Sequence, residues 1–300
     1  MTVLEADAAG VTAAPPIGQA GAADLPTREQ VMARAGTENF PVASVVLGRE
    51  RRAHLLALYG FARLVDQVGD DVGGDRLALL NALSTQTSAI WTDPGRTPAH
   101  PVLRALAPTV AACRLPAEPF ERLIEANRVD QRVARYETFE DLLGYCRLSA
   151  APVGELVLGV FGVATPERIA LSDRVCAGLQ VVEHLQDVAE DFARGRVYLP
   201  AEDLRRFGCD ERELAAAAAS PALRQVIALE AARCRELLGA GPSLARTLPP
   251  RPRLAVSAFV AGGRATVAAI ERAGHDVLAS RPRRSRTGMA AALAAVVVGR

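Results

Sequence analysis

Two acidic pairs with the same spacing most strongly constrain what this chain can fold into. Asp66 and Asp70 form the first pair, and Asp187 and Asp191 form the second. On an α-helix, residues four apart lie on one face, about one turn from each other. Two helices with such faces turned toward each other would form a pocket of carboxylate oxygens. That pocket suits Mg²⁺ bridging a diphosphate, because Mg²⁺ binds few carboxylates and completes its shell with water and phosphate oxygens.

Each acidic pair also extends into a longer polar stripe. Tyr59 and Arg63 precede the first pair at helical spacing, and Gln180 and Glu183 precede the second pair in the same way. The alternative interpretation is a solvated helix face, which one pair alone would favour. Carboxylates on a mostly apolar helix are costly unless they meet a cation. Two such stripes in one chain therefore favour a metal site.

Basic and phenolic side chains near the stripes are candidate donors to a diphosphate. Arg194, Arg196 and Tyr198 follow the second pair, and Arg52 stands about two turns before the first stripe. Guanidinium groups form strong charge-assisted hydrogen bonds with phosphate oxygens. We expect His184, beside the second stripe, to pack or to hold a hydrogen bond rather than to bind the metal.

The remaining sequence predicts an all-α protein. Ala, Leu, Arg and Glu are abundant, and apolar residues recur at intervals of three and four. Because 50% of the residues are hydrophobic, the chain can bury a large core. We expect one helical bundle around a central apolar cavity. The predicted helices are 45–68, 77–91, 100–113, 119–136, 139–161 with a break at 151–152, 166–192, 211–219, 221–238 and 253–273, with a loop at 193–209.

Composition and missing motifs exclude several classes of function. The formal net charge of +1 provides no basic field for nucleic acid. Five scattered cysteines without metal-ligand spacing favour reduced thiols in a cytosol. The chain has no GxGxxG, GxxxxGK[ST], GxSxG or HExxH motif, so the sequence indicates no dinucleotide site.

Both ends of the chain are typical of flanking segments. Residues 1–28 are rich in Ala, Gly and Pro and predict a disordered leader rather than a signal peptide. Residues 281–300 join a basic stretch to an apolar run too short to cross a bilayer. We expect this tail to fray, with weak contact to anionic lipid as the alternative. The catalytic domain is then 29–280, and no segment has the roughly 18 consecutive apolar residues of a membrane span.

From about Glu38 to Arg281 the chain resembles the squalene/phytoene synthase family. The most specific similarity is a DxxxD helix that runs into Gly-Arg-[Ile/Val]-Tyr-Leu-Pro, which is a signature of that family. The resemblance implies an isoprenoid-synthase fold. The segments that carry it are Leu58-Tyr-Gly-Phe-Ala-Arg-Leu-Val-Asp66, Tyr145-Cys-Arg147, Gly178-Leu-Gln180 and Gln186-Asp-Val-Ala-Glu-Asp-Phe-Ala-Arg-Gly-Arg-Val-Tyr-Leu-Pro200.

The resemblance also implies roles for individual side chains. The four aspartates of the two pairs would bind Mg²⁺, with Mn²⁺ as an alternative cation, and Tyr145 would join them as a catalytic residue. The other implied residues would hold the diphosphate or line the substrate cavity: Asn39, Phe40, Arg52, Tyr59, Arg63, Gln180, Glu183, Arg196 and Tyr198.

Within the family, the likeness is greatest to the HpnC-type enzymes, which convert presqualene diphosphate into hydroxysqualene. The segments Glu38-Asn-Phe-Pro-Val-Ala-Ser44 and Glu183-His-Leu-Gln-Asp187 carry this likeness, together with the residues that follow Tyr145. Three positions depart from the usual patterns: Gln67 replaces an Asp of the first motif, Glu183 replaces an amide, and Ala151 replaces an Asn. We therefore expect an asymmetric Mg²⁺–diphosphate site that ionises one preformed diphosphate.

The implied reaction is ionisation, cation rearrangement and capture by water in squalene and hopanoid biosynthesis. Two alternatives stay open: condensation of two prenyl diphosphates to presqualene diphosphate, squalene or phytoene, and a non-catalytic family member that acts as a scaffold. The implied partners are the prenyl diphosphate substrate, a presqualene diphosphate synthase and a hydroxysqualene reductase. We expect no nicotinamide cofactor and a cytoplasmic location, with peripheral contact at the inner face of the membrane as an open alternative.

Overall fold

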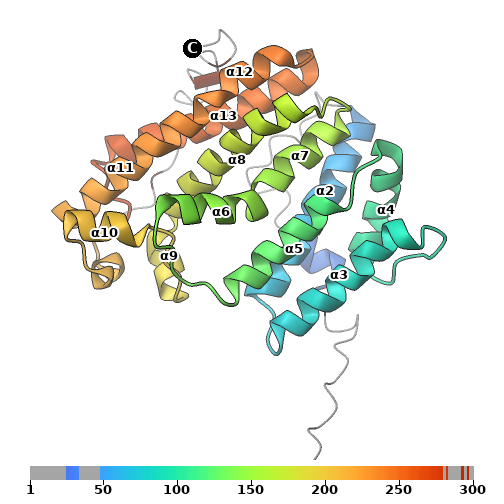
Figure 1. Cartoon of the computed structure of the whole chain (residues 1–300), viewed down its shortest axis with the longest axis horizontal. Helices are drawn as coiled ribbons and strands as arrows, with labels where there is room; N and C mark the ends of the chain where they lie inside the picture. The colour runs from blue at the N-terminus through green and yellow to red at the C-terminus, as the bar shows by residue number, and fades with distance from the viewer. Residues whose placement is uncertain (1–24, 34–47, 280–281, 283–291, 294–295, 297–300) are drawn as a thin grey trace, which may run out of the picture.

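The computed structural model describes residues 25–33, 48–279, 282, 292–293 and 296, and every secondary-structure element named there is helical (Figure 1). This architecture confirms the all-α prediction. The helices are α1 (Arg28–Met32), α2 (Arg49–Asp70), α3 (Arg76–Thr92), α4 (Pro101–Cys113), α5 (Glu118–Asp130), α6 (Phe139–Ser149), α7 (Ala151–Val160), α8 (Pro166–Gln186), α9 (Val188–Ala193), α10 (Ala201–Phe207), the 3₁₀ turn η4 (Glu211–Ala215), α11 (Pro221–Leu238), α12 (Ala240–Thr247) and α13 (Pro250–Arg272).

Local sequence signals fix where many of these helices begin. Thr165 and Ser220 cap α8 and α11 through their hydroxyl oxygens, and each is followed by a proline in the first turn. This order is favourable, because the hydroxyl oxygen accepts a hydrogen bond from a free backbone N–H in the first turn, whereas proline has no N–H that needs a partner. Thr138 begins α6 with a reciprocal capping box to Asp141. The interruption predicted near residue 151 is confirmed, since α6 ends at Ser149 and α7 starts at Ala151.

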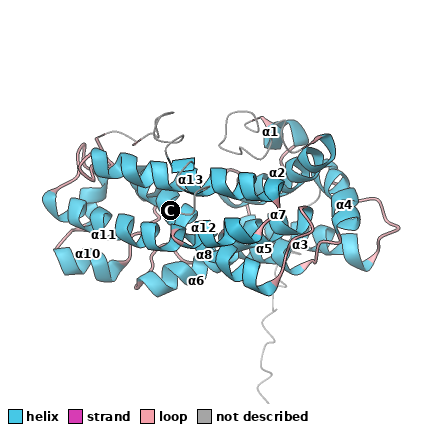
Figure 2. Ribbon diagram, turned by 90° about the horizontal axis from the view of Figure 1, so that it is seen from above, coloured by secondary structure: helices cyan, strands magenta, loops and turns pink. Residues whose placement is uncertain are grey.

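Two hydrophobic cores divide the molecule. The N-terminal core comes mainly from α1 to α5 and includes an edge-to-face pair between Phe61 and Phe120, with ring centroids 5.1 Å apart. The C-terminal core comes mainly from α6, α8 and α10 to α13. Helices α7 and α13 contribute residues to both cores. Seen from above, α2 and α13 lie in one layer and α5, α6 and α8 in the other (Figure 2).

Several predicted boundaries are wrong. The predicted helix 166–192 is two helices, because the backbone leaves the helical conformation at Asp187 (φ −111°, ψ 14°). Residues 193–209, predicted as a loop, contain α10. Helices α1 and α12 were not predicted, because at five and eight residues they are too short to show a clear apolar period. The first predicted helix, 45–68, corresponds to α2, and its predicted start at residue 45 lies outside the described residues.

The described parts of the two flanking segments contact the helical domain. Leu25, assigned to the leader, is buried in the N-terminal core, and His100 Nε2 lies 2.9 Å from Pro26 O. In the tail, Pro282 O accepts a hydrogen bond from Gln186 Nε2 at 2.6 Å, and Val296 is buried in the C-terminal core. Residues 1–24 and most of residues 281–300 lie outside the described residues.

Helix α13 is long and apolar enough to cross a membrane by length and mean hydropathy. However, 67% of its apolar window is buried inside the protein. It packs against α8, α11 and α12 and contributes side chains to both cores. Its hydrophobicity is therefore used for internal packing.

Candidate active site

The first acidic pair lies on α2, an unbroken helix, as the spacing predicts. Asp66 hydrogen-bonds to Asn127 of α5 and lies near the charges of Asp70 and Arg63. Burial, followed by the Asp70 charge, raises the pKa of Asp66 to about 7, and Arg63 partly opposes the shift. Asp66 is nevertheless reached by solvent. Surrounding protein can raise the pKa of a side chain that solvent still reaches. We call the space beside this carboxylate, near Asp70 and Glu183, the recess.

Helix α8 brings the second stripe to the same recess. Glu183 is solvent-accessible, and its charge is one of the causes that raise the pKa of Asp66. Gln180 Nε2 lies 3.2 Å from His184 Nε2, and His184 Nδ1 lies 3.7 Å from Asp191 Oδ2. His184 therefore interacts with Gln180 and lies near Asp191, two residues of the second stripe, which agrees with the predicted hydrogen-bonding role.

The break at Asp187 changes the geometry of the second pair. Asp187 closes α8, and Asp191 belongs to the separate helix α9, so the two carboxylates do not share one straight helical face. The Asp191 backbone N–H still donates to Asp187 O at 2.8 Å. The four-residue spacing thus predicts the geometry of the first pair correctly and that of the second pair only in part.

A tight turn after α9 returns the chain toward α2. Gly195 has a φ of +82°, a conformation that favours glycine, and it lets the Arg196 N–H donate to Asp191 O at 2.9 Å. The Arg196 side chain then reaches Asp70, with Nη1 and Oδ1 2.7 Å apart. Burial would lower the pKa of Arg196, but Tyr198 and Asp70 raise it above its usual value. This ion pair joins the two acidic stripes.

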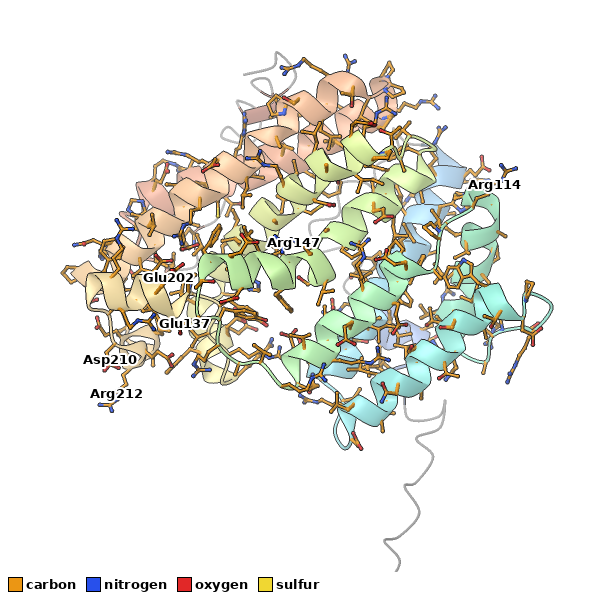
Figure 3. All side chains as sticks on the ribbon, viewed as in Figure 1. Arg114, Glu137, Arg147, Glu202, Asp210 and Arg212 are labelled. Atoms are coloured by element: carbon orange, nitrogen blue, oxygen red, sulfur yellow. The ribbon has the colours of Figure 1, made fainter. Side chains whose placement is uncertain are left out.

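The segment after Arg196 is held by the linker between α5 and α6. Val197 N–H donates to Ala134 O at 2.9 Å in an isolated parallel bridge. Farther along, Glu202 N–H donates to Glu137 O at 3.0 Å, and the two side chains lie near each other in Figure 3. These backbone contacts place Tyr198 among the residues of α5 and α6.

An aspartate that the sequence analysis missed organises the tyrosines of the site. Asp130, the last residue of α5, accepts hydrogen bonds from Tyr145 OH at 2.6 Å and from Tyr198 OH at 3.1 Å. Burial raises the pKa of Asp130, although both tyrosines and Arg196 lower it. Its position offers a signal, because a carboxylate at a helix C-terminus opposes the helix dipole and calls for another explanation.

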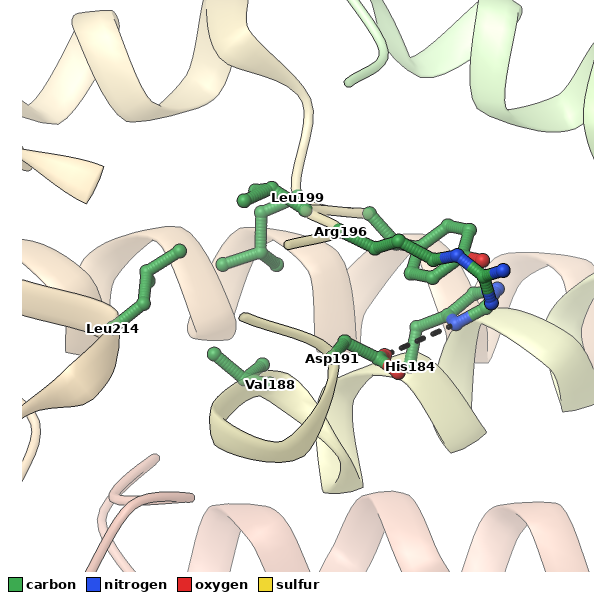
Figure 4. Close-up of a pocket in the computed structure, with 8 residues that line it drawn as sticks. His184, Val188, Asp191, Arg196, Leu199 and Leu214 are labelled. Carbon is green, nitrogen blue, oxygen red and sulfur yellow. Dashed lines mark ion pairs between the residues drawn. The ribbon is translucent and has the colours of Figure 1, made fainter. Parts of the chain in front are cut away.

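Stacked rings extend this cluster. Tyr198 stacks on His184 with centroids 3.8 Å apart, and Tyr136 and Tyr145 pack beside it at 5.8 and 5.6 Å. The Tyr136 hydroxyl is buried, and no described residue forms a hydrogen bond with it. Behind Arg196, a small hollow is lined by His184, Asp191 and apolar side chains that include Leu214 (Figure 4).

The remaining predicted residues fall into three groups. Arg63 and the buried Tyr59 share α2 with the first pair, and Arg63 Nε is buried with no hydrogen-bond partner in the part of the chain that the structure describes. Arg52 is exposed near the start of α2, and Arg194 points to Glu190 at 2.9 Å rather than to the recess. Asn39 and Phe40 lie outside the described residues.

The donor set of the recess fits a hard divalent cation. The acidic donors are carboxylate oxygens, which hard divalent cations prefer, and burial and the Asp70 charge raise the pKa of Asp66. Within the described part of the chain, no three His, Cys, Asp or Glu side chains cluster tightly enough to enclose a metal by themselves. Metal binding at this recess would therefore draw further oxygens from water or from a bound anion.

Comparisons with known proteins place this geometry in context. The model of the family described as squalene/phytoene synthase matches residues 33–288. The chain is 36% identical to a hydroxysqualene synthase of Rhodopseudomonas palustris over 212 residues, which cover 69% of this chain and 70% of that protein. It is 31% identical to a phytoene synthase of Mycobacterium tuberculosis over 175 residues, 58% of this chain and 57% of that protein.

Solved structures give the same result for the fold. The chain matches the crystal structure of squalene synthase HpnC from Alicyclobacillus acidocaldarius with a TM-score of 0.76 and 44% identity, covering 83% of this chain and 93% of that one. A dehydrosqualene synthase in complex with a ligand matches with a TM-score of 0.79 and 22% identity, covering 90% and 94%, and supports the fold alone. Together these matches confirm the fold that the sequence motifs predict.

Proposed function

The chain belongs to the squalene/phytoene synthase family, and we propose that it converts presqualene diphosphate into hydroxysqualene in a Mg²⁺-dependent reaction. The observation that carries the proposal is the Arg196–Asp70 ion pair, which brings the two acidic stripes and their arginines to one recess. The similarity to proteins named hydroxysqualene synthase supports this reaction over the condensation of two prenyl diphosphates. The enzyme would act as a carbon–oxygen lyase on a diphosphate, in squalene and hopanoid biosynthesis.

We propose that the four aspartates of the two pairs hold Mg²⁺, with Mn²⁺ as an alternative. When bound, the cation supplies positive charge to the departing diphosphate. The protein adds its own charge through Arg196 and Arg63, and the Arg63 Nε has no hydrogen-bond partner among the described residues. Arg52 is too exposed near the start of α2 to be assigned more than an auxiliary role. No nicotinamide is part of the proposal.

The remaining residues would shape the cation left behind. Tyr59, Tyr145 and Tyr198 are buried, and Gln180 is tied to His184, so these groups have fixed orientations. Fixed dipoles and aromatic rings can stabilise a carbocation without reorganising during the reaction. Apolar side chains of the two cores would limit the entry of bulk water around the cation, so that one positioned water completes the reaction. Glu183 adds a negative charge that helps to retain the cations in the recess.

A paired substrate assay tests the proposal. Purified protein with Mg²⁺ is incubated with presqualene diphosphate alone and, separately, with farnesyl diphosphate alone, and the products are separated by chromatography. We expect hydroxysqualene from the first incubation and no product from the second. Presqualene diphosphate or a hydrocarbon formed from farnesyl diphosphate would instead indicate a condensing enzyme. No turnover of either substrate, or of a longer prenyl diphosphate, would favour a scaffold.

We also propose a cytoplasmic enzyme that contacts the inner face of the membrane peripherally. Its substrate and product are strongly apolar, so transfer to a bilayer or to neighbouring enzymes avoids their release into water. The partners would be a presqualene diphosphate synthase and a hydroxysqualene reductase. Flotation with anionic and neutral vesicles tests the membrane contact, and the absence of binding to either would remove it.

A further inference from the structure

A reaction that ends in water capture needs a group that takes a proton from the water. The four paired aspartates would be occupied by metal, and Arg63 and Arg196 carry positive charge. His184 is buried, and both of its ring nitrogens face partners, Gln180 and Asp191. These groups leave few proton acceptors in the recess.

Asp130 has the geometry of such an acceptor. Its two oxygens each accept one tyrosine hydroxyl, from Tyr145 at 2.6 Å and from Tyr198 at 3.1 Å. An ionised carboxylate has about four acceptor positions, so about two remain for a water molecule. Asp130 is partly exposed, whereas both tyrosines are buried. The hydroxyls thus fix the orientation of the carboxylate and leave one side open to the solvent-accessible space.

Asp130 also lies close to the charged part of the recess without belonging to it. Its charge interacts with those of Arg196 and Asp70. Burial is the largest influence on this group and makes its carboxylate a stronger base than an exposed one. The base therefore lies near the diphosphate site, and among the residues that the structure describes its carboxylate forms no ion pair with an arginine.

We propose that Asp130 is the catalytic base that holds and deprotonates the water captured by the carbocation, an inference that rests on the proposed function. The water oxygen forms a C–O bond with the allylic carbon, and one of its O–H bonds breaks. The proton passes to a carboxylate oxygen of Asp130, which leaves a neutral alcohol and a protonated acid. Tyr145 and Tyr198 act as positioning residues for the carboxylate.

The test measures diphosphate release and the organic products separately on presqualene diphosphate. In Asp130→Asn we expect diphosphate release within about threefold of the wild type and a fall in alcohol of about 100-fold, the usual contribution of a general base. The trapped cation should instead lose a proton from a neighbouring carbon and give a hydrocarbon. Glu125→Gln, on the exposed side of the same helix, is the matched control and should keep the wild-type product ratio.

Each result has a defined meaning. If Asp130→Asn still forms the alcohol as the main product, or if it loses diphosphate release and alcohol in equal proportion while its thermal midpoint is unchanged, the proposal is wrong. Should that variant fail to fold, Tyr145→Phe decides, because it keeps the carboxylate and removes one orienting donor. It should shift the product ratio toward hydrocarbon, and an unchanged ratio overturns the proposal. A wild type that forms no alcohol contradicts the proposed function itself.

Discussion

The first acidic pair lies on an unbroken helix, whereas the second pair spans the junction of two helices. Asp66 and Asp70 are held by α2, whose apolar face is buried in the N-terminal core. Asp187 lies between α8 and α9, and Asp191 lies within the short helix α9, which is followed by the turn at Gly195. Equal spacing in a sequence therefore does not ensure equal geometry.

The difference assigns separate tasks to the two halves of the site. The α2 half presents a carboxylate that solvent still reaches, with the pKa of Asp66 raised to about 7 by the surrounding protein and by the Asp70 charge. The α8–α9 half adds the turn that sends Arg196 across to Asp70. The α2 half supplies a rigid acidic surface. The α8–α9 half supplies Arg196, which forms an ion pair with that surface.

The largest effects should come from removing one carboxylate in each half. Asp66→Asn and Asp187→Asn should each lower turnover by about 1,000-fold or more, because charge stabilisation of the leaving group is lost. The comparison predicts that only Asp66→Asn raises the thermal midpoint, since it neutralises a desolvated carboxylate beside Asp70. Asp71→Asn, an exposed aspartate one residue beyond α2, is the control. Wild-type turnover in both site variants would contradict the assignment.

The next effect concerns the ion pair between the halves. Arg196→Gln and Asp70→Asn should each reduce turnover by about 10- to 100-fold, and a double-mutant cycle should give a coupling of about 1–3 kcal/mol. Steady-state kinetics on the four proteins measure this coupling. Arg194→Gln removes an arginine that pairs with exposed Glu190, and it should stay within about twofold of the wild type. Additive effects of the two site variants would show that the halves act independently.

Two glycines test the packing behind each half. In Gly69→Ala, the new Cβ would lie 2.1 Å from Asn127 Oδ1, and Asn127 is hydrogen-bonded to Asp66. In Gly178→Ala, it would lie 3.0 Å from Leu237 Cβ and 3.1 Å from Leu238 Cγ. Both changes should lower the free energy of unfolding by about 1–3 kcal/mol. Only Gly69→Ala should also reduce turnover per folded molecule, and equal loss in both would reject the link from Asn127 to Asp66.

The smallest effect concerns pH and the C-terminal core. Glu230 is fully buried beside Arg233 and Asp203, and burial raises its pKa to about 8 from 4.5, although Arg233 opposes the shift. Between pH 4.5 and about pH 8, Glu230 keeps a proton in the folded protein that it releases in the unfolded chain. The free energy of unfolding therefore falls as pH rises through this range. Glu230→Gln should flatten this fall and gain about 1–2 kcal/mol at pH 8 relative to the wild type.

Denaturant unfolding at pH 5 and pH 8 measures this difference. Glu236→Gln, on the exposed side of the same helix, should behave as the wild type at both values. A Glu230→Gln chain with the wild-type pH dependence would place the titrating group elsewhere.

The sequence predicted the helical fold and the α2 half of the site because both depend on local signals. Thr165-Pro166 and Ser220-Pro221 mark helix starts, and the four-residue spacing holds along α2. The break at Asp187 has no neighbouring proline or glycine, so nothing local predicts it. Asp130 was missed because its partners, Tyr145 and Tyr198, are 15 and 68 residues away and meet it only in the folded chain.

The central claim is that the two halves form one diphosphate site, and calorimetric titration of Mg²⁺ with inorganic diphosphate tests it most directly. The wild type, Asp66→Asn, Asp191→Asn and the double variant are titrated under the same conditions. If both halves hold one anion, each single variant should lose most of the binding, and the double variant should be scarcely weaker than either. If each single variant instead retains binding and the two losses simply add, the halves bind separately and the account is contradicted.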